Sequence, residues 1–199
     1  MSTIHRNHHA LKLLLTYWSK QNGLEDFHIH WARSKLKLVR FRRHQEIFLR
    51  AGDRHSIILV TKGMIAQLGE SSEENSRNIK EIDIAGMVFS TTTHLFSRTP
   101  AMAKLIALRS GDLLLIPYRE LLKFSDRDPK INELIRILFN RKLRTLSYMN
   151  RVNRLHRPLQ RYQEFSLLFP EIRNSCSYRE QADLLSLSKS TVNRFCKRL

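Results

Sequence analysis

The last 23 residues of the chain, from Ser177 to Leu199, carry two helix-start signals in close succession. Ser177 and Glu180 have the S-x-x-E spacing of a capping box, in which the serine accepts an N–H of the first turn and the glutamate reaches back to the cap. Ser186-Leu187-Ser188 then interrupts the apolar periodicity, and Ser188 is a good N-cap for a second helix that begins at Lys189. This stretch therefore predicts a helix-turn-helix.

The second of these helices has two different faces. Val192, Phe195 and Cys196 recur at helical spacing and are expected to face the first helix. The outward positions are basic or polar, and no acidic residue follows them: Lys189, Ser190, Asn193, Arg194 and Lys197. A short helix that exposes such side chains from its first turns suits recognition of the DNA major groove. The alternative is an ordinary helical hairpin with a solvated basic face.

The charge of the whole chain supports a polyanionic partner. The formal net charge is +17, from 35 Lys and Arg against 18 Asp and Glu, and the pI is near 10.6. Nucleic acid is the usual partner of so basic a protein. The segment from Arg151 onward carries +6, from ten basic and four acidic residues, although the stretch from Arg33 to Arg50 is basic as well.

Composition also limits the class of protein. Apolar residues make up 42% of the 199 positions, with only 6 Gly and 5 Pro, which is typical of folded chains of one large or two small domains. No segment approaches the ~20 apolar residues of a membrane span. The short run Leu11–Trp18 contains Lys12 and has no small-residue cleavage site, so no signal peptide is expected. We expect a cytoplasmic protein without a membrane partner.

Cysteines and histidines give no strong sign of a metal centre. Cys176 and Cys196 lack C-x-x-C spacing and are expected to be buried thiols, and two cysteines do not supply the four thiolates of an iron–sulfur cluster. His5, His8 and His9 could bind a metal, but near a terminus we expect a solvated tail. The sequence therefore predicts no metal site.

The first two thirds of the chain read as one short helix followed by strands. Ile4–Trp18 predicts an amphipathic helix, Lys62-Gly63 and Arg109-Ser110-Gly111-Asp112 predict turns, and Gly69–Asn78 predicts a polar loop inside a hairpin. Strands are predicted around Leu36–Phe41, Ile47–Leu49, Ser56–Val60, Met64–Leu68, Ile79–Ile84, Lys104–Leu108 and Leu113–Ile116. Several short strands at this spacing indicate a sandwich or barrel.

The following segment predicts one long helix. Asp126 and Asp128 cap and charge its start, Pro129 stands where its missing N–H costs little, and no Pro or Gly follows before Pro158. A helix over 126–157 would be roughly 40 Å long. Its apolar positions lie near a 3.5-residue repeat, with Leu134, Leu143 and Leu146 beside it: Ile131, Ile135, Leu138, Lys142, Thr145, Met149 and Val152. This seam favours a homodimer. The alternative is a helix packed wholly on its own barrel.

A barrel, a long dimer-type helix and a C-terminal helix-turn-helix, in this order, resemble the Crp/Fnr family of bacterial transcription regulators over nearly the whole chain. The most specific match lies in Ser177–Leu199, where S-x-x-E and S-K-S-T-V-N-R resemble the family's T-x-x-E and S-R-E-T-V-x-R. Arg50-Ala51-Gly52-Asp53 and Val60-Thr61-Lys62-Gly63 resemble its barrel signature. The stretch RYQEFSLLFPEI, from Arg161 to Ile172, is similar to a divergent branch common in Bacteroidetes.

The resemblance implies an α+β protein in three parts. These are an N-terminal cyclic-nucleotide-binding-like β-barrel (jelly-roll) sensor domain over 1–125, a dimerisation helix over 126–157 and a helix-turn-helix DNA-binding domain over 158–199. A further helix, Leu159–Phe169, is predicted after the break at Arg157-Pro158, because the residue before proline avoids helical backbone.

The resemblance also implies DNA-binding positions. Lys189, Ser190 and Arg194 would read bases, Asn193 lies among them, and phosphate contacts would come from Ser177, Ser188 and Thr191. The chemistry agrees, because Lys and Arg bind guanine O6 and N7, and hydroxyls at helix N-termini bind phosphate. The chain departs from the family at three positions: Ser186 replaces the turn glycine, Gln181 an apolar residue, and Ser190 the acidic base reader.

The family's nucleotide-binding residues are matched poorly. Cyclic-nucleotide binders in the family have Gly-Glu and then Arg-Ser or Arg-Thr after a short helix. Here Gly86 is followed by Met87, and Arg98-Thr99 comes one residue late and precedes Pro100. A guanidinium and a hydroxyl still suit an anion, so Gly86, Arg98 and Thr99 are candidate ligand residues. We expect no cyclic AMP dependence and no cofactor, with an unknown small-molecule effector left open.

Taken together, these features predict a homodimeric, sequence-specific DNA-binding transcription regulator whose partners are double-stranded DNA and, as a further candidate, RNA polymerase. The alternative is a ligand-sensing module that acts through protein partners and binds DNA only non-specifically. An enzyme is not expected, because the chain has no Gly-rich phosphate loop, no H-E-x-x-H and no G-x-S-x-G. Asp126 and Asp128 read as helix-start charges rather than as a catalytic pair.

Overall fold

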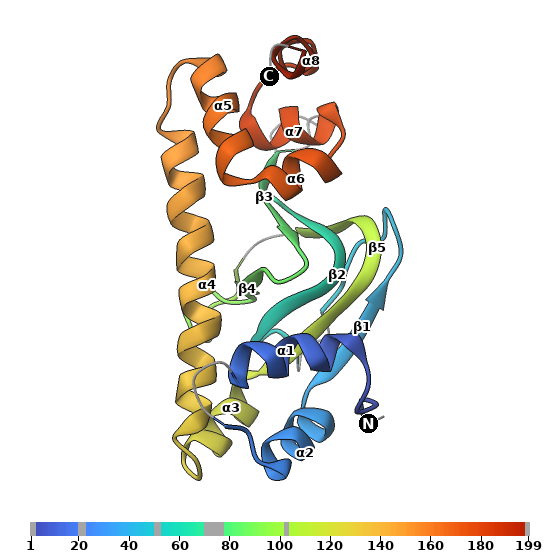
Figure 1. Cartoon of the computed structure of the whole chain (residues 1–199), viewed down its shortest axis with the longest axis vertical. Coiled ribbons are helices and arrows are strands. Elements are labelled where there is room, and N and C mark those ends of the chain that lie inside the picture. Colours follow the sequence, from blue (N-terminus) through green and yellow to red (C-terminus); the bar gives the residue numbers. More distant parts are fainter. Residues whose placement is uncertain (1–2, 20–22, 50–52, 70–77, 102–103, 198–199) are drawn as a thin grey trace.

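The protein is an α+β fold in which a bent antiparallel sheet lies beside one long helix, with helices α5 to α8 at one end (Figure 1). The structure, a computed structural model, describes residues 3–19, 23–49, 53–69, 78–101 and 104–197. In chain order the elements are α1 (His9–Ser19), α2 (Asp26–Lys35), β1 (Lys37–Phe41), β2 (Ser56–Leu68), β3 (Ile79–Ile84), β4 (Val88–Ser90), β5 (Lys104–Pro117), α3 (Tyr118–Ser125), α4 (Lys130–Asn153), α5 (Pro158–Leu168), α6 (Pro170–Ser175), α7 (Tyr178–Leu185) and α8 (Lys189–Cys196).

The sheet has the order β1-β5-β2-β3, and β4 also pairs with β2. All pairings are antiparallel, and β2 and β3 form a hairpin in which Met64 lies opposite Ile84. The predicted strand Ile79–Ile84 is confirmed with the same bounds. The sheet curves over a barrel interior filled by buried apolar side chains, among them Phe41, Ile58, Val60, Ile65, Phe89, Leu113 and Leu115.

Strands β2 and β5 are each continuous, so the two turns predicted inside them are wrong. Both strands bend together instead, and their register shifts between Val60 and Ile65. A Cβ on Gly63 would lie 2.5 Å from Ser110 O, and one on Gly111 would lie 1.9 Å from Lys62 O. The glycines thus allow the two backbones to cross closely. Glycine is also typical of turns, which is why the sequence predicts turns at these positions.

The N-terminal helices differ from the prediction in two respects. Helix α1 begins at His9 rather than at Ile4, whose N–H donates to Arg33 O instead. Helix α2 was not predicted, and it begins with an unusual capping box in which Glu25 pairs with His28. Because histidine rarely fills that position, the usual capping pattern gives no signal here.

The predicted strand Ile47–Leu49 is wrong, and the barrel signature is described only in part. Ile47–Leu49 is not a strand, and only an isolated bridge joins the neighbouring Glu46 to Ile106. Residues 50–52 of the barrel signature lie outside the described residues, whereas Asp53 is buried and forms an ion pair with Lys37.

Helix α4 has 24 residues and is therefore about 36 Å long. It begins at Lys130, whose N–H donates to Asp128 Oδ1 at 2.8 Å, rather than at residue 126. No described helix is both long and apolar enough to cross a membrane.

The predicted partner-facing seam of α4 is wrong, because this stripe packs within its own chain. Five apolar residues of the stripe and its flank are buried: Ile131, Leu134, Leu138, Met149 and Val152. The first three join the core beneath α1 to α3, and the last two join the core of the C-terminal helices. A 3.5-residue repeat shows that one side of a helix is covered, but not whether the same chain or a partner covers it. Here the same chain covers it.

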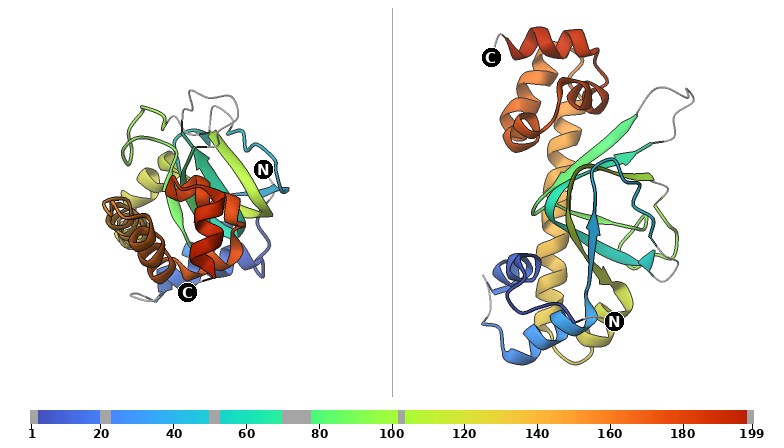
Figure 2. Two further views of the ribbon diagram at one scale, coloured as in Figure 1. Left: turned by 90° about the horizontal axis from the view of Figure 1, so that it is seen from above. Right: turned by 90° about the vertical axis from the view of Figure 1, so that its right-hand side faces the viewer.

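The C-terminal helices share one apolar core with the sheet. Met64, Ile82 and Leu108 of the strands pack in the same buried cluster as Tyr162, Phe165, Ile172, Leu185 and Phe195 of α5 to α8. The helix-turn-helix is therefore not a free appendage, since its inner side lies against the sheet and the last turns of α4 (Figures 1 and 2).

Candidate nucleic-acid interface

The helix-turn-helix has both predicted caps. Ser177 Oγ accepts the Glu180 N–H at 3.3 Å, and Glu180 Oε2 accepts the Ser177 N–H at 2.7 Å, which completes the capping box of α7. Ser188 Oγ accepts the Thr191 N–H at 3.0 Å and caps α8. Helix α7 ends at Leu185, and its C-cap Ser186 has a left-handed φ of 51°. A glycine at this position would adopt that backbone more easily, which explains why the resembling family has one there.

The polar residue inside the motif has its own partners. The Gln181 side chain is buried; its Oε1 accepts the Tyr162 hydroxyl at 3.0 Å, and its Nε2 donates to the carbonyl oxygens of Arg173 and Cys176 at 2.9 and 3.0 Å. A buried amide costs little when each of its groups is bonded. The Tyr162 hydroxyl, which lies in the motif RYQEF, therefore gives Gln181 a hydrogen-bond donor at a position where the family has an apolar residue.

The face of α8 that points away from α7 is basic and polar. Lys189, Ser190, Asn193 and Arg194 are exposed, Thr191 is half-buried, and Val192 and Phe195 are buried against the rest of the motif. Helix α8 forms the far end of the molecule, with no other element beyond it (Figure 2). This face is free to approach a large polyanion.

The cysteine prediction holds for only one thiol. Cys176 is buried beside Met64, with 3.5 Å between the sulfur atoms, and burial raises the pKa of its thiol to about 12. Cys196, expected on the inner face of α8, is half-exposed.

Three hydroxyl groups gather where α8 begins. Ser188 Oγ lies 2.9 Å from Ser190 Oγ and 2.7 Å from Thr191 Oγ1, in the first turn of the helix. Lys189 is exposed at the same end. Helix N-termini with hydroxyl groups and a nearby ammonium favour phosphate. Ser177 is likewise exposed at the start of α7, where its hydroxyl serves as a cap.

One arginine of the sheet holds the helix-turn-helix in place, and no pattern in the sequence indicates this role. Arg109 of β5 donates to both carboxylate oxygens of Glu180, at 2.9 and 3.0 Å, and to Ser175 O at 2.7 Å. Burial opposes charge on Glu180, but hydrogen bonds from Arg109 and from the Ser177 N–H outweigh it and hold the pKa of this carboxyl below its usual range. Glu180 thus caps α7 and anchors it to the sheet.

A second charged cluster joins the sheet to α4. Lys142 of α4 donates to Glu81 of β3 at 2.5 and 2.6 Å, and Gln67 of β2 donates to Asp83 Oδ2 at 2.6 Å. The Asp83 side chain is fully buried, and its Oδ1 has no hydrogen-bond partner in the described part of the chain. Burial first, and then the charge of Glu81, raise the pKa of Asp83 from 3.8 to about 7, although Lys142 and Gln67 act against this rise.

The candidate ligand residues do not gather around one described cavity. Gly86 has a left-handed φ of 89°, and its carbonyl accepts Arg141 Nε at 2.9 Å beside a small cavity next to α4. Arg98 and Thr99 do not line this cavity and are exposed. Their segment has no helix over residues 91–101, unlike the short helix that precedes Arg-Ser or Arg-Thr in cyclic-nucleotide binders.

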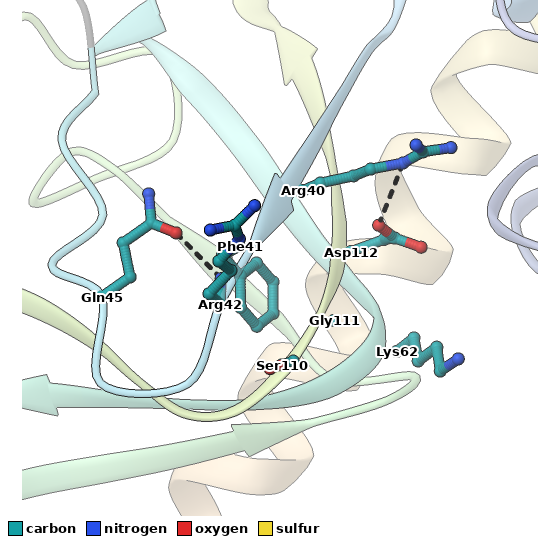
Figure 3. Close-up of a pocket in the computed structure, with 8 residues that line it drawn as sticks. All are labelled: Arg40, Phe41, Arg42, Gln45, Lys62, Ser110, Gly111 and Asp112. Carbon is teal, nitrogen blue, oxygen red and sulfur yellow. Dashed lines mark hydrogen bonds and ion pairs between the residues drawn. The ribbon is translucent and has the colours of Figure 1, made fainter.

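A groove of about 450 Å³ lies at the bend of β2 and β5, and its lining includes the basic residues Arg40, Arg42 and Lys62 (Figure 3). Asp112 also lines the groove and forms a long ion pair of 3.8 Å with Arg40, which is drawn in Figure 3. None of the predicted ligand residues lines this groove.

Asp112 also lies beside two N-terminal histidines, which the sequence alone does not bring together with it. His9 Nε2 is 3.3 Å from Asp112 Oδ2, and His8 is close enough for all three to face one ion. The positive end of α1 and the Arg40 guanidinium oppose a cation here, so we assign the trio to a network of polar contacts around Asp112. The absence of a metal site stays a prediction.

The joint role of Arg109 and Glu180 predicts a strong coupling between them. Arg109→Ala should lower the free energy of unfolding by about 1–3 kcal/mol, because it leaves a half-buried carboxylate without its partner. Glu180→Gln should cost a similar amount. In urea unfolding of the two single variants and the double variant, the double variant should lose clearly less than the sum of both. Additive losses would show that the two side chains act independently.

The buried position of Asp83 predicts a pH effect on stability. Its folded-state pKa of about 7 lies above the 3.8 of an ordinary aspartate, so the folded protein holds a proton that the unfolded chain has lost between these values. The stability that the folded protein gains from holding this proton is fully present below pH ~4 and is lost as the pH rises through ~7. Asp83→Asn should therefore gain about 2–4 kcal/mol over the wild type between pH 4 and 8.

The matched control for this prediction is Asp126→Asn, which changes an exposed aspartate. Its stability difference from the wild type should not vary with pH over the same range. A pH-independent difference for Asp83→Asn as well would contradict the account of the buried carboxyl.

Comparison with known proteins gives the fold but no close relative. No family profile matches the sequence, and no curated protein matches it. Among solved structures, the chain is similar to FixK2 from Bradyrhizobium japonicum, with a TM-score of 0.63 and 18% identity over 82% of this chain and 84% of that one. A cyclic nucleotide-binding domain containing protein from Listeria monocytogenes has a TM-score of 0.65 and 15% identity over 96% and 90% of the two chains.

A third similar structure is a putative transcriptional regulator of the Crp/Fnr family from Eubacterium rectale. It has a TM-score of 0.63 and 13% identity, over 92% of this chain and 87% of that one. The second and third likenesses cover 96% and 92% of this chain, so they include parts of the sheet, the long helix and the C-terminal helices. The chain therefore has the fold of Crp/Fnr-type regulators and cyclic-nucleotide-binding proteins, as the sequence predicts.

Proposed function

We propose that the protein is a homodimeric, sequence-specific DNA-binding transcription regulator of the Crp/Fnr type. The observation that carries the proposal is the exposed face of α8, where Lys189, Asn193 and Arg194 stand out from a doubly capped helix-turn-helix. A protein of net charge +17 with such a helix at its far end suits DNA better than a protein partner. None of the three similar structures named above is described as an enzyme.

The base-reading and phosphate-binding residues are proposed to have separate places on this face. Arg194, Lys189 and Asn193, with Ser190, would face base edges in the major groove. The hydroxyl groups of Ser188, Thr191 and Ser177 would lie near phosphates, since each is at or beside a helix N-terminus. The Arg194 guanidinium also lies 5.5 Å from the Phe195 ring, which restricts its motion.

The proposed dimer uses a different stripe of α4 from the one that the sequence favours. Phe139, Leu143 and Leu146 are 41%, 47% and 39% exposed, and with Asn150 they follow a 4-3-4 spacing along one side of the helix. Leu143, Leu146 and Asn150 line a groove that continues to Leu155. Apolar side chains at heptad spacing on an exposed helix favour pairing with an equivalent helix.

The division of the chain at 1–125, 126–157 and 158–199 and the assignment to the Bacteroidetes-like branch belong to the proposal as well. Independence from cyclic AMP is also proposed, because Met87 stands where the resembling binders have the ribose-binding glutamate. Contact with RNA polymerase is a further part of the proposal and rests on the resemblance alone.

The exposed stripe predicts the effect of one charge on the dimer. Leu143→Glu places a carboxylate in the centre of the apolar stripe, so the variant should sediment as a monomer at concentrations at which the wild type is a dimer. The matched control is Leu122→Glu on α3, since Leu122 has the same exposure of 47%. The control should remain a dimer. Equal behaviour of both variants would place the dimer contact elsewhere.

The exposed face of α8 predicts a selective effect on DNA binding. Arg194→Ala should cost about 1–3 kcal/mol on the preferred DNA site and much less on random duplex, because a base contact is lost only where the right base is present. Lys12→Ala, which removes an exposed positive charge from α1, serves as the control and should leave both affinities nearly unchanged. Equal losses on both DNAs would show that Arg194 contacts only phosphate.

A further inference from the structure

A small cavity lies where the sheet, α4 and the C-terminal helices meet. Its volume is about 160 Å³. The β3–β4 turn contributes Gly86 and Met87, α4 contributes four polar side chains, and Leu168 and Phe169 close it at the boundary of α5 and α6. Every lining residue is described by the structure, and none of them is acidic.

The polar lining is cationic and hydroxylic. It consists of the guanidinium groups of Arg141 and Arg144 and the hydroxyl groups of Thr145 and Tyr148. Arg141 and Arg144 are three residues apart on α4, where like charges repel each other. In the described part of the chain neither arginine pairs with a carboxylate.

Arg141 is held rigidly by partners that leave part of its guanidinium free. Its Nε donates to Gly86 O at 2.9 Å, its Nη2 donates to the Tyr17 hydroxyl at 3.2 Å, and the group stacks 4.0 Å above the Tyr17 ring. Of the five N–H donors of an arginine, these bonds use two. A Cβ on Gly86 would lie 3.1 Å from Arg141 Nη2 and 2.6 Å from the Tyr17 hydroxyl oxygen, so only glycine permits this arrangement without displacement.

We propose that this cavity binds a small tetrahedral oxyanion, as free phosphate or as the phosphoryl group of a small metabolite, between Arg141, Arg144 and the hydroxyl of Tyr148. Paired guanidinium groups bind phosphate through several charge-assisted hydrogen bonds. The cavity is smaller than the ~300–1,000 Å³ of typical pockets for drug-sized ligands, which favours a single phosphoryl group over a whole nucleotide. The site differs from Arg98 and Thr99, and its occupancy is measured without DNA, so it does not depend on the proposed function.

The test is isothermal titration calorimetry of the full chain with three ligands: inorganic phosphate, glycerol 3-phosphate and 3′,5′-cyclic AMP. We expect saturable binding of phosphate or of the monoester at one site per chain. Tighter binding of the monoester identifies a phosphorylated metabolite as the source, and tighter or equal binding of phosphate identifies the free ion. Absence of binding by both, or tighter binding of cyclic AMP, would overturn the proposal.

Matched variants locate the site. Arg144→Gln should weaken binding at least tenfold and Tyr148→Phe severalfold. Both change exposed side chains that make no hydrogen bond within the described part of the chain. Arg127→Gln removes an exposed arginine between α3 and α4 and should leave the affinity unchanged. If Arg144→Gln binds as the wild type does, or if Arg127→Gln weakens binding equally, the binding is adventitious and the proposal is wrong.

Discussion

The arrangement of the C-terminal helices depends on a bidentate ion pair between Arg109 of β5 and Glu180 of α7. Glu180 also closes the capping box at the start of α7, so one carboxylate sets both the beginning of the helix and its attachment to the sheet. The apolar core shared by the sheet and the C-terminal helices includes Met64, Leu108 and Phe165 and forms the contact surface around this ion pair. The direction in which α8 faces is therefore fixed by the sheet.

Helix α4 connects the two ends of the molecule, and two of its sides differ in burial. One side is buried against the chain itself and bears Lys142, which pairs with Glu81 beside the buried Asp83. The other side exposes Phe139, Leu143 and Leu146. If two copies pair through this second side, the position of each α8 relative to the other follows from contacts that already exist within one chain.

Local signals in the sequence were sufficient for the helix-turn-helix. Ser177, Glu180 and Ser188 act on backbone groups within three residues of themselves, so their spacing alone predicts both caps. The strand Ile79–Ile84 was predictable for a similar reason, since alternation is a local property.

Features that depend on distant contacts were not predictable in this way. Arg109 lies 71 residues before Glu180 and stands in what the sequence presents as a turn. Gly63 and Gly111 mark a crossing of two bent strands, but a glycine after Lys or Ser looks the same at a turn. On α4, apolar residues occupy more than one side, and only the packing shows which side the chain itself buries.

The most direct test of the account is a selection from random duplex DNA with the purified full chain, without added ligand, at ~150 mM salt. Salt at this level suppresses binding that rests on charge alone, so enrichment reports contacts to bases. We expect an enriched inverted repeat whose half-site centres lie ~34 Å apart, one turn of DNA, as two paired recognition helices require. No enriched sequence, together with DNA binding that falls steeply as salt rises, would contradict it.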